Sequence, residues 1–456
     1  MMSPVDKEHE DAPTPSSEEA VIKPRRSFSK GIEGWRYLMA LWIYVFHYGS
    51  HWSSETSNVY TAHVQTAVAS FMIISGFVLA MAYERRDWGS QPGKQWMWFM
   101  GTRLARVYPL YFIGWAATLY WTITEQHWSQ TWFGEQVCSV ETAPGSTAAR
   151  IITSLFLCQS WYPSTFFAVN GPAWFMSTLF WVWTIFPVAI RLLKSRSSSV
   201  LLVAIFGFWI LGLIPTIVLW STDNFEQNCV SFVYRDNPIF RVPEFLVGVC
   251  FGLLMNKQQH GGYELPSKYP WRLVKWGGDL AFLAIVLPIY LINEFVGIRD
   301  EMFLPRLFVL PMGIVLYYTA WNQGFAASVV SAPGLCDLGR YAWGIYILQE
   351  ALWYSLCSMV TGNGELQCFA HDDKEFGWAR ETNNSVAVFL LLNIVAGLCL
   401  QWEVPLYKYA KAKIEEKLGL STVKNNDKPQ EAGDIGETAK PCSSQGFDAP
   451  SAEEDC

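Results

Sequence analysis

The stretch GWRYLMALWIYVFHYGSHW, residues 34–52, decides what kind of fold this chain adopts. Ten uncharged, mostly apolar residues run from Tyr37 to Phe46, with Arg36 before them and His47 after them. Such a run predicts a helix in a hydrocarbon environment. At about 100° per residue, the steps from Arg36 to His47 make three turns and about 20°, so both side chains leave one face of the helix. They lie about 16 Å apart along its axis.

The composition places the whole chain among membrane proteins. Of its 456 residues, 51% are hydrophobic, 16% aromatic and 16% charged, whereas soluble chains are about 25% charged. The 23 tryptophans suit a protein with two membrane–water interfaces. No cleavable signal peptide is expected, because the first 30 residues contain no apolar core.

Acidic residues are concentrated at the two ends of the chain. Residues 1–20 and 421–456 each carry a net charge of −5, against −7 for the whole chain, so the remainder is net basic. Both ends are rich in Ser, Pro, Glu and Asp, which is typical of disorder. We therefore expect a disordered acidic tail over 1–30, a transmembrane domain over 31–407 and a largely disordered cytoplasmic tail over 408–456. Nothing in this pattern indicates nucleic-acid binding.

The apolar runs predict an all-α fold, a polytopic membrane bundle of about ten transmembrane helices. Each run is long enough, or nearly so, to cross a hydrocarbon core of ~30 Å at ~1.5 Å per residue. The segment ITSLFLCQSW, residues 152–161, is too short to span and is expected to be re-entrant or interfacial. The predicted spans are 35–52, 59–83, 107–124, 171–193, 199–220, 239–256, 274–293, 303–321, 341–360 and 384–407.

The distribution of basic residues predicts the orientation, because short cytoplasmic segments carry more Lys and Arg than outer ones. With the N-terminus in the cytoplasm, the inner segments include Arg85, Arg86, Lys94, Arg103, Arg106, Lys194, Arg196, Lys257, Lys268, Arg272 and Arg340. The outer loops hold only Arg150, Arg235, Arg299, Lys374 and Arg380. Both termini are therefore expected in the cytoplasm. The kind of membrane, endomembrane or plasma membrane, stays open.

The paired arginine and histidine in the first span are candidates for function. Polar groups left unsatisfied in hydrocarbon cost several kcal/mol, so they usually face a cavity or the bundle interior. The structural alternative for Arg36 is that its long side chain reaches the interface. The alternative for His47 is a satisfied polar group within the bundle. Because Arg36 and His47 lie on the same face of the helix, we favour a functional role for the pair over the structural alternatives.

Six segments in order resemble the signatures of the acyltransferase 3 family of integral membrane acyltransferases. The first is the Arg-x10-His pattern of Arg36 and His47. The other five segments follow in the order in which the family has them, so the resemblance covers roughly residues 31–407. They are FMIISGFVLA (71–80), RLARVYPLYF (103–112), GPAWFMSTLFWVWTIFP (171–187), RVPEFLVGVCFG (241–252) and LGRYAWGIYILQE (338–350).

Two departures from the family pattern bear on mechanism. Many members carry an acid after the Trp of the fourth segment, where this chain has Phe175, Met176, Ser177, Thr178 and Leu179. This weakens any carboxylate-assisted mechanism built on that helix. Many members also end the last segment with His, where this chain has Gln349. Glutamine forms hydrogen bonds but takes up no proton at physiological pH.

The resemblance implies an enzyme that transfers an acyl group other than aminoacyl, commonly acetyl, to a hydroxyl of a glycan, a lipid or a small molecule. Acyl-coenzyme A is the expected donor and no permanently bound cofactor is expected. A histidine with a pKa of about 6.5 suits the removal of a hydroxyl proton, so His47 is the expected general base. A transient acyl-imidazole on His47 is the alternative.

Arginines are the candidates for binding the phosphates of the donor, because the guanidinium group binds phosphate through two hydrogen bonds. Arg36, Arg103 and Arg106 are expected on the cytoplasmic side, and Arg103 and Arg106 share a helix face at i, i+3. Arg36 is also a candidate for holding the thioester end. The alternative for Arg103 and Arg106 is anchoring at the interface.

Arg241 and Glu244 lie at i, i+3 at the predicted outer end of a helix. They form either a structural ion pair or a site that binds the acceptor or orients His47. Pro243 between them is expected in the first turn of that helix.

No Cys/His spacing predicts a metal site. Cys138, Cys229 and Cys368 fall in predicted outer loops, and two of them could form a disulfide if that side is lumenal or extracellular.

Two other classes compete with this interpretation. A transporter also has many helices and charges within the membrane, but its two halves often contain matching broken helices, and no such pairing is visible here. A different class of membrane acyltransferase uses an Asn–His pair, and the Arg-x10-His spacing argues against it. The sequence does not identify the acceptor.

Overall fold

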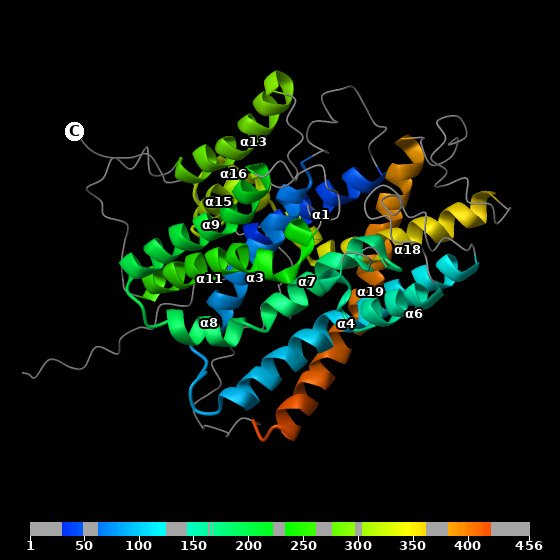
Figure 1. The fold of residues 1–456 in the computed structure, drawn as a ribbon, viewed down its shortest axis with the longest axis horizontal. Helices are drawn as coiled ribbons and strands as arrows, with labels where there is room; N and C mark the ends of the chain where they lie inside the picture. The colour runs from blue at the N-terminus through cyan, green and yellow to red at the C-terminus, as the bar shows by residue number, and fades with distance from the viewer. Residues whose placement is uncertain are drawn as a thin grey trace, which may run out of the picture.

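The protein folds as a bundle of α-helices in the computed structural model, which describes residues 30–48, 63–124, 144–162, 165–166, 168–221, 233–260, 276–296, 303–361 and 382–420. No strand occurs among these residues, which confirms the predicted all-α class. Figure 1 shows the arrangement, with α3 near the centre and α1, α7 and α11 around it.

The first half of the bundle is formed by helices on either side of the central α3. Their bounds are α1 (Gly31–Tyr48), α3 (Gln65–Tyr83), α4 (Pro92–Thr124), α6 (Pro144–Leu155), η1 (Gln159–Trp161), η3 (Gly171–Ala173), α7 (Trp174–Trp183), α8 (Phe186–Leu193) and α9 (Ser198–Ser221). The second half comprises α11 (Pro238–His260), α13 (Gly277–Val296), α14 (Phe303–Leu307), α15 (Val309–Ala320), α16 (Phe325–Val330), α17 (Pro333–Leu338), η5 (Gly339–Tyr341), α18 (Ala342–Thr361) and α19 (Thr382–Lys417).

Each of the ten predicted spans coincides with a helix or helix pair in the described residues. Only four of these helices are long and apolar enough to cross a membrane by the criteria of length and hydropathy, and the number rises to five if α7 and α8, bent by 47°, form one span. The four cover 65–83, 198–219, 233–258 and 385–417. Helix α1 includes Glu33, Arg36 and His47, and these residues make its mean hydropathy lower than that of the four helices. The fold and these helices indicate a membrane protein, while the count of ten and the cytoplasmic termini stay predictions.

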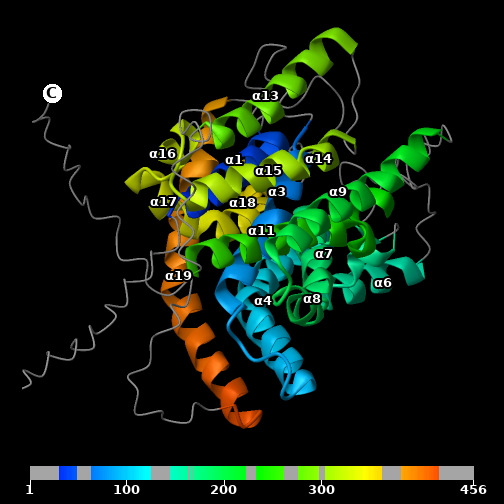
Figure 2. The same ribbon diagram turned by 90° about the vertical axis from the view of Figure 1, so that its left-hand side faces the viewer.

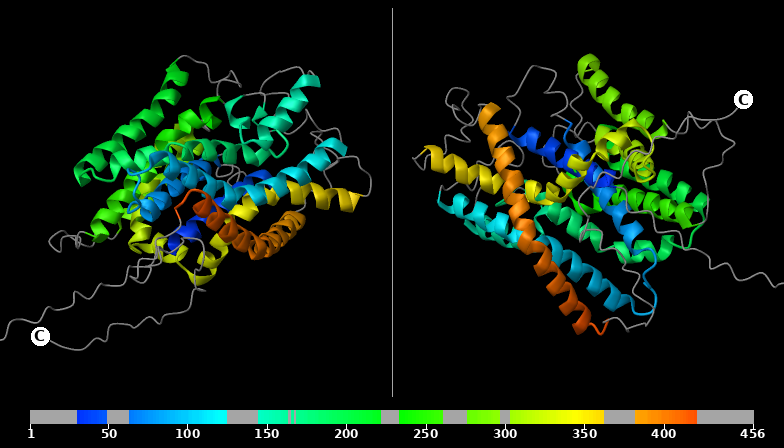
Figure 3. Two further views of the ribbon diagram at one scale, coloured as in Figure 1. Left: turned by 90° about the horizontal axis from the view of Figure 1, so that it is seen from below. Right: turned by 180° about the vertical axis from the view of Figure 1, so that it is seen from behind.

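Segment 152–161 is not a spanning helix. It comprises the end of α6, a short connection and the single turn η1. Two helices are also longer than predicted, since α4 begins at Pro92 and α19 ends at Lys417. Their extra turns lie side by side and project beyond the other helices (Figure 2). Figure 3 shows α19 crossing the face of the bundle to reach α4. Cys138, Cys229 and Cys368 lie outside the described residues.

Helices α3 and α11 are parallel and in direct backbone contact. A Cβ atom added to Gly76 would lie 2.1 Å from the carbonyl oxygen of Phe245, and one added to Gly248 would lie 2.2 Å from that of Ile73. Gly252, four residues after Gly248, approaches the Phe77 carbonyl in the same way. Small residues at this spacing let membrane helices pack closely. The contact explains why the segments around Gly76 and Gly248 are glycine-containing.

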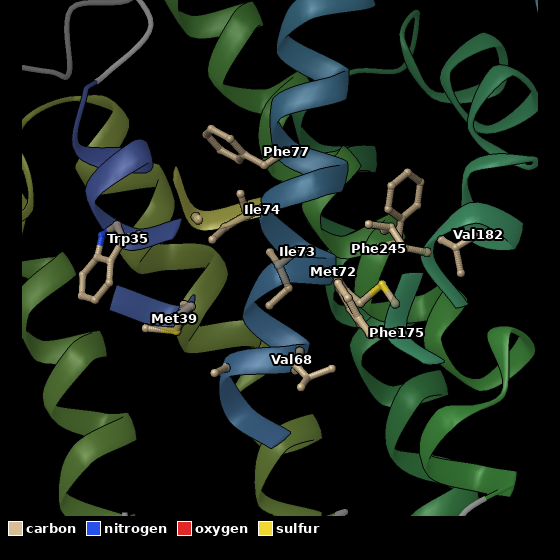
Figure 4. Packing of buried hydrophobic residues seen from close by; sticks show 14 of the residues in the cluster. Trp35, Met39, Val68, Met72, Ile73, Ile74, Phe77, Phe175, Val182 and Phe245 are labelled. Carbon is tan, nitrogen blue, oxygen red and sulfur yellow. The ribbon is translucent and has the colours of Figure 1, made fainter. Parts of the chain in front are cut away.

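Buried apolar side chains fill the space around α3. Met72 and Phe77 on α3, Phe175 on α7 and Phe245 on α11 are all almost completely buried. Figure 4 shows Met72 on the side of α3 that faces Phe175 and Phe245, whereas Phe77 projects from the other side, on which Trp35 and Met39 of α1 lie. The buried core contains residues from all six signature segments.

Candidate active site

Helix α1 positions Arg36 and His47 at opposite ends of the bundle. We call the end with His47, the first turns of α3 and α11 and the second half of α18 the histidine end. We call the opposite end, which holds Arg36, the arginine end, and we assign Arg103 and Arg106 to it, although no hydrogen bond or ion pair among the described residues joins Arg36 to either of them. The arginine end of α1 is fixed by backbone contact, because a Cβ atom on Gly34 would lie 2.0 Å from the Val330 carbonyl oxygen. Trp35 adds a hydrogen bond from Nε1 to Thr319 Oγ1 of 2.9 Å.

The imidazole of His47 is hydrogen-bonded to Gln349 of α18, with Nδ1 and Oε1 separated by 3.3 Å. The amide orientation follows from its second contact, since Nε2 of Gln349 donates to the Tyr346 carbonyl at 2.9 Å. A carbonyl only accepts, so Oε1 must face His47 and Nδ1 must carry the proton. The other ring nitrogen, Nε2, then has a lone pair with which to accept a proton. The departure from the family pattern at Gln349 thus lies directly against the expected base.

The last turn of α1 is held by α18 and α19 on both sides of His47. The Tyr44 hydroxyl donates to the Ser385 carbonyl, and the Ser385 hydroxyl donates to the Tyr48 carbonyl, both at 2.8 Å. The ring of Tyr48 stacks on Trp353 with centroids 4.6 Å apart. These contacts restrict the orientation of His47, which is only half-buried itself.

Glu350, next to Gln349, is a buried carboxylate that the sequence analysis did not single out. Its Oε2 accepts a hydrogen bond from the Gly171 backbone N–H, and Tyr354 forms a further hydrogen bond to it. The adjoining turn is also held at Asn170, whose Nδ2 donates to the Ile347 carbonyl at 3.1 Å. Val169 has a φ of 66°, a costly conformation for a β-branched residue that only firm surrounding contacts maintain. Its position as an ionisable residue within the predicted span 341–360 is the signal that would have identified Glu350 as a candidate.

Arg241 and Glu244 form a fully buried ion pair at the histidine end. Nη1 of Arg241 lies 2.9 Å from Oε1 of Glu244, and Nη2 donates to Oε1 of Gln65 on α3 at 3.1 Å. Neither side chain contacts His47 among the contacts of the described residues. The position of Pro243 was predicted wrongly, because α11 begins at Pro238 and Pro243 lies inside it. Proline is favoured in the first turn of a helix, but α11 has helical residues before Pro243, so Pro243 lies past its first turn.

The three arginines of the arginine end each have weak or incomplete partners. Arg36 pairs with Glu33 at 3.0 Å, and 35% of its side chain is exposed. Arg103 donates from Nη2 to the Tyr83 hydroxyl at 2.6 Å, while its buried Nε has no partner within the described part of the chain. Arg106 lies 3.9 Å from Glu403, beyond hydrogen-bond distance.

An apolar cleft of about 530 Å³ lies between α4 and α7, and its lining includes Leu104, the residue that follows Arg103. It contains no titratable side chain and no residue of α1 or α18, so it is not a reaction centre. Among the described residues, no group of three His, Cys, Asp or Glu side chains is placed to bind a metal ion. The cleft is lined by Trp96, Met100, Gly101, Leu104, Phe180, Trp181 and Thr184.

The chain belongs to the acyltransferase 3 family. The family model, described as an acyltransferase domain, matches residues 29–400, which confirms the resemblance of the six segments. No curated protein and no solved structure gives a match. The protein is therefore an acyltransferase with helices suited to a membrane, and nothing favours the transporter over it.

The residues that stand on α7 where many family members carry an acid have other roles. Phe175 and Met176 are part of the apolar core. The Ser177 hydroxyl donates to the Leu157 carbonyl, and the Thr178 hydroxyl donates to the Asp236 carbonyl at 2.6 Å. Helix α7 therefore contributes packing and backbone fixation, and the nearby buried carboxylates come from α18 and from Asp236.

Proposed function

We propose that this protein is a membrane-embedded O-acyltransferase that moves an acyl group, acetyl in the simplest case, from acyl-coenzyme A to a hydroxyl of a glycan, lipid or small-molecule acceptor. The family supports acyl transfer in general. The observation that carries the proposal is the hydrogen bond between His47 and Gln349, because it favours a neutral imidazole with Nε2 as the proton acceptor.

In the proposed reaction, His47 Nε2 removes the proton of the acceptor hydroxyl as the oxygen attacks the thioester carbonyl. A new C–O bond forms and the C–S bond of the donor breaks. The proton on the imidazolium then passes to the leaving sulfur of coenzyme A. Gln349 acts as a positioning residue, since it holds the tautomer that accepts the proton and takes up none itself. Direct transfer requires no acyl-enzyme intermediate.

The donor is proposed to bind with its phosphates at the arginine end. Arg36, Arg103 and Arg106 have donors there that are exposed, unpartnered or only loosely paired. Phosphate oxygens are strong acceptors for guanidinium groups. About 16 Å of α1 separates Arg36 from His47, and the extended pantetheine arm of coenzyme A is suited to cover such a distance. The family's basic segment at Arg103 and Arg106 would thus bind the donor.

The proposed topology places the arginine end in the cytoplasm and the histidine end on the opposite side. Lys94, Arg86 and Lys194 lie at the arginine end together with Arg103 and Arg106, and the Lys194 ammonium donates to the Arg86 carbonyl at 3.1 Å. An excess of basic residues supports this orientation. Ten spans with both termini cytoplasmic remain the arrangement that we propose.

The test is transfer of label from radiolabelled acetyl-coenzyme A to acceptors in a cell extract by the purified protein. His47→Ala is expected to lower transfer by about 10²- to 10⁴-fold, the usual contribution of a general base. The matched control is Val45→Ala on the same helical turn, which should retain transfer.

Two results would contradict different parts of the proposal. Full transfer by the folded His47→Ala protein would exclude His47 as the base. If the unaltered protein moves no label to any component of the extract, acetyl-coenzyme A is not its donor.

A further inference from the structure

Helix α18 carries a buried carboxyl group directly after the residue that orients His47. Glu350 is 7% exposed, and it follows Gln349, whose Oε1 lies 3.3 Å from the imidazole. Among the described residues, no ion pair joins Glu350 to a cation. A buried carboxylate without a cation is costly and rare. Because the reaction proposed above leaves Glu350 unused, its presence calls for a function of its own.

Two hydrogen-bond donors hold this carboxyl group in place. The backbone N–H of Gly171 donates to Oε2 of Glu350. The hydroxyl of Tyr354, one turn further along α18, donates to the same carboxyl group. Both contacts suit a carboxylate, which only accepts hydrogen bonds, and charge-assisted bonds of this kind are strong. Glu350 can therefore present a negative charge in a fixed position.

Two consecutive residues at the end of α1 face two consecutive residues of α18. His47 is hydrogen-bonded to Gln349, and Tyr48 interacts electrostatically with Glu350. The Tyr48 ring also stacks on Trp353, three residues after Glu350, with centroids 4.6 Å apart. The imidazole and the carboxyl group thus occupy neighbouring positions of one helix contact. In a buried environment of low dielectric constant, a charge on one of them acts strongly on the other.

The other groups around the carboxyl group do not cancel its charge. Asp236, which interacts with one of the neighbouring tyrosines, is itself neutralised by Arg235 at 2.8 Å. The contacts of α19 and α4 at this end of α1 and α18 come from Ser385 and Trp121, which do not titrate. The ionisable neighbours are phenols, which are uncharged in neutral solution. They are Tyr48, Tyr346 and Tyr354.

We propose that Glu350 is a positioning residue that stabilises the imidazolium form of His47 during acyl transfer. His47 Nε2 takes the hydroxyl proton as the new C–O bond forms, and it returns this proton to the sulfur of coenzyme A after the C–S bond breaks. Glu350 takes up no proton in this cycle and supplies only negative charge. Helix α7 contains no Asp or Glu, so the charge comes from α18. This inference rests on the proposed function, because it concerns the base of the same reaction.

The first test removes the charge and keeps the hydrogen-bond acceptor. In Glu350→Gln an amide oxygen can still accept from Gly171, but the maximal rate of label transfer should fall roughly tenfold because the imidazolium loses its counter-charge. The half-saturating concentration of acetyl-coenzyme A should not change. Glu350→Asp keeps the charge and should recover part of the rate. The control Glu416→Gln removes an exposed carboxylate at the far end of α19 and should retain the full rate.

Titration of the His47 imidazole separates an effect of charge from an effect of packing, and it requires no substrate. Magnetic resonance of the isotope-labelled protein follows the imidazole signal that His47→Ala lacks. Its midpoint should lie about one pH unit lower in Glu350→Gln, because the positive form loses its stabilising charge. Glu350→Asp and Glu416→Gln should keep the midpoint of the unaltered protein.

Two outcomes would overturn the role of Glu350. One is an equal midpoint in Glu350→Gln and the unaltered protein, and the other is full label transfer by Glu350→Gln. If the unaltered protein transfers no label, the proposed function fails, and the titration still decides whether Glu350 stabilises the charged imidazole.

Discussion

Two ion pairs of nearly the same geometry occupy opposite ends of the bundle. Glu33 and Arg36 on α1, and Arg241 and Glu244 on α11, are both i, i+3 pairs with N–O distances of 3.0 and 2.9 Å. At the arginine end 35% of the Arg36 side chain is exposed, whereas Arg241 at the histidine end is 2% exposed. Burial, and not distance, therefore separates a pair that can exchange partners from one that cannot.

The difference has a physical basis in solvation. A charge left unpaired in a buried position costs several kcal/mol, while an exposed pair contributes about 0–1 kcal/mol because water solvates either partner alone. Arg36 can therefore leave Glu33 for a phosphate at little cost. Arg241 cannot leave Glu244 at such a low cost, which supports a structural role for this pair.

The largest expected effect is that of Glu244→Ala, which leaves Arg241 buried and unpaired. The free energy of unfolding should fall by about 3–5 kcal/mol, the usual cost of breaking a buried pair. Chemical denaturation in detergent measures it. The double variant Arg241→Met/Glu244→Leu serves as the control and should recover much of the loss. An unchanged stability in Glu244→Ala would show that the pair is available for ligands, as at the arginine end.

The second effect concerns the orientation of His47. Gln349→Leu removes the acceptor for the Nδ1 proton, so both tautomers become accessible and the rate of acyl transfer should fall roughly tenfold. The half-saturating concentration of acetyl-coenzyme A should stay the same, because Gln349 lies at the other end of α1 from the proposed phosphate site. A rise in that concentration alone would contradict the separation of the two ends.

The variant Arg103→Lys tests whether Arg103 at the arginine end binds the donor. Lysine keeps the charge but loses the planar set of donors and the stacking on Tyr83, whose ring centroid lies 5.5 Å from the guanidinium carbon. Binding of coenzyme A, measured by calorimetry, should weaken by roughly fivefold, and the maximal rate should change little. Equal binding by the variant would assign Arg103 to interfacial anchoring.

The smallest effect is expected for Glu33→Gln. Stability should change by less than about 0.5 kcal/mol, because the pair is partly exposed. Removal of the competing carboxylate should tighten coenzyme A binding by roughly twofold. A loss of stability comparable with that of Glu244→Ala would show that exposure does not distinguish the two pairs.

Much of the fold could be predicted because apolar runs determine where membrane helices form. Each of the ten predicted spans overlaps a helix among the described residues, and the family was identified from six short segments. The longer ends of α4 and α19 were missed because their exposed turns lack a continuous apolar run. The pairing of Arg241 and Glu244 was one of two predicted alternatives, and its burial explains which one the structure favours.

The candidate site was less predictable, because its partners come from distant segments. Glu33, the partner of Arg36, is only three residues away and could have been identified from the spacing. Gln349, 302 residues from His47, was recognised only as a departure from a family pattern. Tertiary packing therefore supplies the information that local patterns lack.

The glycine contacts between α3 and α11 also have a mechanical consequence. With backbone against backbone at Gly76 and Gly248, no layer of flexible side chains separates the two helices, and sliding would bring large residues such as Phe77 or Phe245 into the other backbone. We therefore expect α3 and α11 to move together as one rigid unit. A transporter that exposes one site alternately to the two sides of a membrane needs helices that move relative to each other. If the proposed function holds, the donor and the acceptor would instead reach two helices that stay fixed relative to each other.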